Sequence, residues 1–111
     1  MSAASRRTAI IVLTSVTAII HLLVLNFGIY QLKGSIDLLF TLNGLGFFAL
    51  LYAYLNDVPA GRKNLVRWAL IAYTLVTILA WVVVNGDFSN PLGVFTKAVE
   101  LLLVIVLWMD K

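Results

Sequence analysis

The longest apolar run of the chain restricts its fold more than any other feature. It extends from Thr8 to Leu32, and no charged residue lies between Arg7 and Lys33. About 20 consecutive apolar residues are enough for a helix to cross the hydrocarbon core of a bilayer. Further runs of this kind follow along the chain. The sequence therefore predicts four transmembrane helices, over about residues 8–32, 35–55, 65–85 and 92–109.

The composition agrees with a membrane protein and excludes other classes. Of the 111 residues, 62% are hydrophobic and 12% are charged. A soluble domain of this size has about a quarter of its residues charged, and a disordered chain is poor in apolar residues. The strands of a membrane β-barrel alternate apolar and polar residues over about 10 positions, whereas these runs are continuous. We therefore expect one integral membrane domain that covers residues 1–111.

Short connections between the runs predict an all-α, four-helix transmembrane bundle with up-down-up-down topology. Basic residues in the cytoplasmic loops set the orientation of such a protein. Four crossings place most basic residues on one face and leave Lys33, Asp37 and Asp87 near the other. We expect a multi-pass protein of the cell membrane with both termini in the cytoplasm, and the net charge of +3 then needs no nucleic-acid partner. The basic residues on the cytoplasmic face are Arg6, Arg7, Arg62, Lys63, Arg67 and Lys111.

Ionisable residues inside the predicted spans are the candidates for a functional site. They are His21, Lys97 and Glu100, with Asn26 and Asn43 as polar neighbours. Each ionisable side chain in a membrane costs about 2.5–3.5 kcal/mol on insertion scales. At about 1.5 Å per residue, His21, Asn43 and Glu100 share one layer near the middle of the membrane, and Lys97 and Asn26 lie about one turn further out. We predict that these side chains meet inside the bundle, because an unpaired polar group is costly there.

Lys97 and Glu100 are separated by one helical turn and share a helix face. One interpretation is an internal ion pair that neutralises both charges. In the other, Lys97 extends to the outer headgroups and leaves Glu100 to His21 or Asn43. A buried glutamate without a cation would then stay neutral or exchange protons.

His21 shares a helix face with Thr14, Thr17 and Gly28. Its simplest role is that of a neutral histidine that hydrogen-bonds to a threonine, or to a carboxylate across the bundle. Two functional roles remain open, namely ligation of a b-type haem and a proton relay with Glu100. A haem would take its second axial ligand from a symmetric dimer or from a partner, or would have none, because the chain has one histidine. We expect no metal site, since there is no cysteine and no HExxH-like spacing.

A stripe of small residues lies in the second predicted span. It consists of Gly46, Ala49 and Ala53 at helical spacing. Small residues allow neighbouring membrane helices to approach closely. We therefore expect this stripe to pack against another helix.

Three segments carry a resemblance to a known group of proteins. The segments are His21-Leu22 through Asn26-Phe27-Gly28, Leu42-Asn43-Gly44-Leu45-Gly46-Phe47, and Lys97-Ala98-Val99-Glu100-Leu101-Leu102. They are similar to segments of small uncharacterised four-span integral membrane proteins of archaea and bacteria. The resemblance covers most of the chain and implies no activity. It points to His21, Asn43, Lys97 and Glu100 as the positions of interest.

These observations lead to several hypotheses for the function. The first is a small integral membrane binding or accessory protein, whose buried polar cluster binds a small polar ligand or carries protons. The second is a haem- or quinone-binding anchor subunit of an electron-transfer complex. The third is a protomer of an oligomeric transporter or channel, since a bundle of this size makes a poor pore alone. A purely structural four-span scaffold also fits the sequence.

The expected partners follow from the membrane location. They are the lipid bilayer and either further copies of the chain or a membrane complex. An enzyme is not expected, because the sequence has no nucleophile elbow, catalytic triad, phosphate loop or pair of carboxylates.

Overall fold

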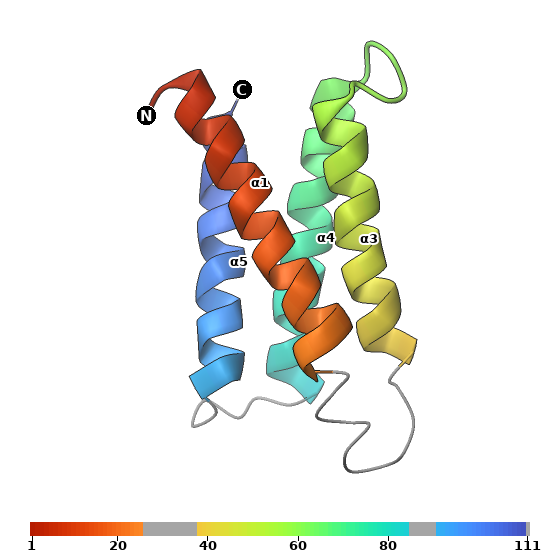
Figure 1. Cartoon of the computed structure of the whole chain (residues 1–111), viewed down its shortest axis with the longest axis vertical. Coiled ribbons are helices and arrows are strands. Elements are labelled where there is room, and N and C mark those ends of the chain that lie inside the picture. The colour runs from red at the N-terminus through yellow and green to blue at the C-terminus, as the bar shows by residue number, and fades with distance from the viewer. Residues whose placement is uncertain (26–37, 85–90, 111) are drawn as a thin grey trace.

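The computed structural model describes residues 1–25, 38–84 and 91–110, and these residues form an all-α, four-helix bundle (Figure 1). The first helix, α1 (Ala3–Ile19), continues into a π-helical segment, η1 (Ile20–Leu25). The others are α3 (Leu38–Leu55), α4 (Lys63–Val84) and α5 (Pro91–Met109). The described residues contain no strand. The structure thus confirms the predicted fold class, with its up-down-up-down order.

The four helices form a square in which each helix has two neighbours. The helix α1 packs against α3 and α5, and α4 also packs against α3 and α5, so α1 and α4 lie on a diagonal. Figure 1 shows both ends of the chain and the connection between α3 and α4 at the same end of the bundle. We call this the basic end, because it carries Arg6, Arg7, Arg62, Lys63 and Arg67.

The ends of the helices differ from the predicted spans in a few places. The helix α1 begins at Ala3 rather than near Thr8, because Ser2 Oγ accepts a hydrogen bond of 3.1 Å from the backbone N–H of Ser5. The apolar run therefore predicted the apolar part of α1 but not the polar residues with which this helix begins. The helix α5 begins at Pro91. Proline is suited to a first turn, because an N–H at this position would have no partner within the helix. Parts of the predicted spans, 26–32, 35–37 and 85, lie outside the described residues.

The connection between α3 and α4 is a compact polar turn. Asp57 has a left-handed φ of 51°, and the N–H of Val58 bonds to the carbonyl of Ala53 at 3.0 Å. This closes the C-terminus of α3. Gly61 has a φ of 75°, which a residue without a side chain adopts at no steric cost. The two helices are therefore antiparallel neighbours.

The outer surface of the bundle is apolar. Many large hydrophobic side chains are exposed along the helices, among them Leu23, Val76, Leu79, Val83 and Ile105. Among the described helices, three are long and apolar enough to cross a membrane: Ala3–Leu23, Lys63–Val83 and Pro91–Met109. The helix α3 contributes a shorter apolar stretch, Thr41–Leu55.

The core contains tightly packed apolar side chains and two close helix contacts made by glycines. A Cβ atom on Gly44 would lie 2.8 Å from the carbonyl oxygen of Ala18, and one on Gly46 would lie 2.2 Å from the hydroxyl of Tyr73. Of the predicted small-residue stripe, Gly46 makes such a contact, whereas Ala49 is exposed. The largest fully buried apolar side chains are Ile10, Phe47, Leu70, Leu103 and Leu107.

Candidate functional site

Glu100 is the centre of a buried charged cluster inside the bundle. Its side chain is completely buried, and both carboxylate oxygens are bound. Lys97 Nζ lies 2.6 Å from Oε1, and Thr17 Oγ1 donates a hydrogen bond of 2.7 Å to Oε2. We call Thr17, His21, Lys97 and Glu100 the ionic cluster. It joins α5 to α1 and its π-helical continuation.

Lys97 pairs with Glu100 instead of extending to the end of the bundle. The two residues are one turn apart on α5, so the helix itself brings them together. The ammonium of Lys97 also lies 5.8 Å from the ring centroid of Trp81 on α4, which is within the range of a cation–π interaction. Lys97 is 8% exposed. The first interpretation of this pair, the internal ion pair, is the one that the structure shows.

His21 lies next to the ion pair, at the start of the π-helical segment. Its Nδ1 is 2.8 Å from the carbonyl oxygen of Thr17. A carbonyl only accepts hydrogen bonds, so Nδ1 of His21 carries the hydrogen of this bond. The ring is 6% exposed and packs against Phe47, with their centroids 6.3 Å apart. His21 is therefore a buried histidine that is hydrogen-bonded within its own helix.

Thr17 is the residue of the cluster that the sequence analysis did not select. It presents its backbone carbonyl to His21 and its hydroxyl to Glu100. The sequence feature that could have indicated Thr17 is its position on the same helix face as His21, at a depth close to that of Glu100. Thr14, one turn earlier, is also completely buried, but its hydroxyl has no hydrogen-bond partner among the described residues.

Asn43 does not join Glu100, contrary to the prediction. Its Nδ2 donates a hydrogen bond of 2.8 Å to Thr77 Oγ1 on α4, and the hydroxyl of Tyr73 donates one of 2.8 Å to the carbonyl of Asn43. Equal depth therefore did not predict the partner of Asn43, because its side chain points from α3 toward α4 and is only partly buried. Asn26, the remaining candidate, lies outside the described residues.

A second polar cluster closes the basic end of the bundle. Arg6 Nε lies 3.0 Å from Asp110 Oδ1, and the hydroxyl of Tyr54 donates to Oδ2 of the same carboxylate. Arg67 Nη1 donates a bond of 3.1 Å to the carbonyl of Leu107, near the end of α5. We call Arg6, Tyr54, Arg67 and Asp110 the clasp. It links all four helices.

The electrostatics of the clasp are dominated by Asp110. Burial acts to raise the pKa of this carboxyl group, but the hydrogen bonds from Tyr54 and Arg6 outweigh it. The pKa of Asp110 is therefore lowered from its ordinary value. The carboxylate stays charged and holds Arg6 at neutral pH.

Comparison with known protein families identifies the family of this chain. A family model matches residues 2–109. The chain belongs to DUF7475, a family of unknown function. Neither the curated proteins nor the solved structures contain a match to the chain.

The DUF7475 match covers the ionic cluster and nearly all of the clasp, since it ends one residue before Asp110. In the part of the chain that the structure describes, no group of three or more His, Cys, Asp or Glu side chains could hold a metal ion. Chemically, the ionic cluster holds the buried carboxylate of Glu100 between two donors, the ammonium of Lys97 and the hydroxyl of Thr17.

Proposed function

We propose that this member of DUF7475 is a small integral membrane protein that crosses the membrane four times. The support is the distribution of polarity between its surface and its interior. Leu23, Val76 and Val83 are 64%, 65% and 74% exposed, whereas Glu100 is completely buried. A soluble protein would place these residues in the opposite way. A surrounding of lipid accounts for both the apolar exterior and the paired charges inside.

The orientation that we propose has the basic end in the cytoplasm. The Lys and Arg residues of cytoplasmic loops determine the orientation of most membrane proteins. The basic end contains five basic side chains from α1, α4 and the α3–α4 connection. Both ends of the chain lie at the same end of the bundle (Figure 1), so both would face the cytoplasm.

Within this setting we infer the role of an accessory or binding protein with a rigid, closed core. The observation that carries this inference is the complete burial of Glu100 with both of its oxygens bound. A conduction path would have to open this arrangement and leave a charge without a partner, at a cost of several kcal/mol. The closed cluster therefore favours a protein that acts through its outer surface over a transporter or channel.

The haem-binding alternative has one observation in its favour. The hydrogen of His21 lies on Nδ1 and bonds to a backbone carbonyl, as it does in many histidine ligands. However, the ring is buried against Phe47 and Thr17, and a porphyrin would have to separate the helices that pack around it. The described residues therefore do not fit a haem inside the bundle.

A first experiment tests membrane integration and orientation. The full chain is expressed, its membranes are washed with alkaline carbonate, and cysteines introduced at exposed positions of the basic end are probed with an impermeant reagent. We expect the chain to stay in the membrane, and the introduced cysteines to react only when the cytoplasmic side is open. Release by carbonate, or labelling from outside the cell, would overturn the proposal.

A second experiment tests whether the core is closed. A hydrophobic carbodiimide modifies buried carboxyl groups only when they are protonated. We expect no labelling of Glu100 in the wild-type protein and clear labelling in Lys97→Met, because the carboxyl group then lacks its cation. Glu100→Gln is the control for labelling elsewhere. Efficient labelling of wild-type Glu100 near neutral pH would favour the proton-relay hypothesis over an accessory role.

A further inference from the structure

The described residues of the basic end carry more positive than negative charge, and the excess lies on particular side chains. Arg6 is bound to Asp110 at 3.0 Å, and Arg67 is buried and bound to Asn64 and to the carbonyl of Leu107. These two cations are therefore already satisfied by the protein. Among the described residues of this end, the remaining acidic side chain is that of Asp57, which accepts a hydrogen bond from the N–H of Gly61.

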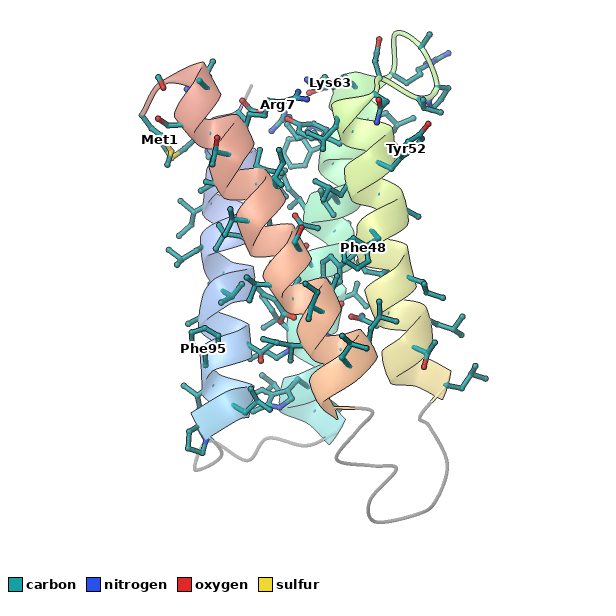
Figure 2. The ribbon with its side chains drawn as sticks, in the orientation of Figure 1. Met1, Arg7, Phe48, Tyr52, Lys63 and Phe95 are labelled. Carbon is teal, nitrogen blue, oxygen red and sulfur yellow. The ribbon has the colours of Figure 1, made fainter. Side chains whose placement is uncertain are left out.

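Three cations of the basic end form no salt bridge among the described residues, although the Asp110 carboxylate also interacts with Lys63 at longer range. Arg7, Arg62 and Lys63 are exposed, and within residues 1–25, 38–84 and 91–110 no carboxylate lies within 4.0 Å of any of them. Lys63 Nζ lies 4.9 Å from the ring centroid of Tyr54, which holds its chain over the end of the bundle. Figure 2 shows Arg7 and Lys63 at the same end of the molecule, on the diagonal pair of helices α1 and α4. An anion at this end would meet positive charge from both sides.

The surroundings of these cations have the character of a membrane interface. Trp68 and Trp108 are about half exposed and stack edge to face, with their ring centroids 5.5 Å apart. Arg67 lies over the Trp68 ring at 4.9 Å. Tryptophan is enriched at the level of the lipid headgroups, and Leu65, which lies between Lys63 and Trp68, is 61% exposed. The cations therefore lie next to apolar surface, as a phosphate joined to acyl chains would require.

We propose that the basic end binds the phosphate groups of anionic phospholipids in the cytoplasmic leaflet, through Arg7, Arg62 and Lys63. This inference rests on the membrane location and orientation proposed above. Both α1 and α4 begin at this end, so the positive ends of their helix dipoles add to the three side chains. Each Lys or Arg near an anionic membrane surface strengthens binding by about fivefold. Lipids with a net negative charge should therefore be enriched around this end over zwitterionic ones.

The test uses the intrinsic tryptophans as reporters. The full chain with Trp81→Phe, which leaves the two tryptophans of the basic end, is reconstituted into vesicles. Fluorescence quenching by brominated phosphatidylglycerol is compared with quenching by brominated phosphatidylcholine, in mixtures of the two lipids. We expect the anionic lipid to be preferred by about fivefold or more. The triple variant Arg7→Gln, Arg62→Gln, Lys63→Gln should reduce this preference to nearly none.

Two controls decide what the result means. The double variant Arg6→Gln, Asp110→Asn removes a cation and its own carboxylate, so it should keep the preference of the parent. Inorganic phosphate added at constant ionic strength should not abolish the preference; if it does while chloride does not, the site serves a soluble phosphate and the lipid assignment is wrong. Equal quenching by both lipids in the parent also overturns it. Absence of quenching by either lipid would instead contradict the proposed membrane location.

Discussion

Thr17 on α1 and Glu100 on α5 are joined by a hydrogen bond of 2.7 Å in the completely buried centre of the bundle. The bond connects residues 83 positions apart in the sequence, and it occupies the carboxylate oxygen that Lys97 leaves open. The hydroxyl of Thr17 thus gives the second oxygen of Glu100 a hydrogen-bond donor, and without it the buried charge would be more costly. The strength of this relationship can be measured.

The first prediction compares two threonines one turn apart. Thr17→Val removes the donor to Glu100 and should lower the free energy of unfolding by about 1–2 kcal/mol. Thr14→Val removes a buried hydroxyl that has no partner among the described residues, so it should raise the stability by up to about 1 kcal/mol. Unfolding in mild detergent with increasing denaturant measures both. Equal effects of the two variants would contradict the structural assignment.

The second prediction concerns the ion pair itself. Glu100→Leu leaves the ammonium of Lys97 buried without its carboxylate and should cost about 3–5 kcal/mol. The double variant Lys97→Met, Glu100→Leu removes both charges and should recover most of the loss. A double-mutant cycle on thermal unfolding gives the coupling between them. If the double variant is no more stable than Glu100→Leu, the pair does not account for the role of either residue.

The third prediction separates two helix contacts. Gly44→Ala would place a methyl group 2.8 Å from a backbone carbonyl of α1, which moves only with its helix, and should cost about 2–3 kcal/mol. Gly46→Ala meets the side chain of Tyr73 instead and should cost about 1 kcal/mol. Adding Tyr73→Phe, which removes the nearest atom, should relieve part of the cost at Gly46 and none at Gly44. Thermal unfolding of the four variants tests this order.

The fourth prediction is a pH dependence located at the clasp. The pKa of Asp110 is lowered from its ordinary value of 3.8, so its contribution to stability is fully present above that value and is lost as the pH falls through the lowered pKa. Asp110→Asn should remove this part of the acid-induced loss, whereas Asp57→Asn, in the exposed connection, should leave it unchanged. Melting temperatures measured from neutral pH down to about pH 3 compare the three proteins. An unchanged acid profile in Asp110→Asn would argue against the clasp.

Most of the fold could be predicted from the sequence because it depends on one property, the length of uninterrupted apolar runs. The run from Thr8 to Leu32 already required a membrane-length helix, and the polar turn around Asn56–Arg62 fixed the antiparallel order of the two helices beside it. The exact beginning of α1 was missed because Ser2 caps the helix through a hydrogen bond that hydropathy does not record. The predicted membrane location itself stays a proposal.

The candidate site was predictable only in part. The spacing of Lys97 and Glu100 on one helix allowed their pairing, and depth placed His21 close to them. Depth does not say in which direction a side chain points around its helix axis, however. Asn43 therefore bonds to Thr77 on α4. Thr17, and not Asn43, donates the hydrogen bond to Glu100. The clasp was missed because Asp110 lies just beyond α5, where a pattern of apolar residues has ended.

The bond between Arg6 and Asp110 has a consequence for the biogenesis of the protein. Arg6 is synthesised before the first helix is complete, and Asp110 only after α5 has been made. The two side chains can meet only when α1 and α5 have packed together, with the beginning of α1 beside the end of α5. A partly folded chain in which α5 has not yet docked leaves Arg6 without this carboxylate. The bond therefore forms only when the first and the last helix have come together.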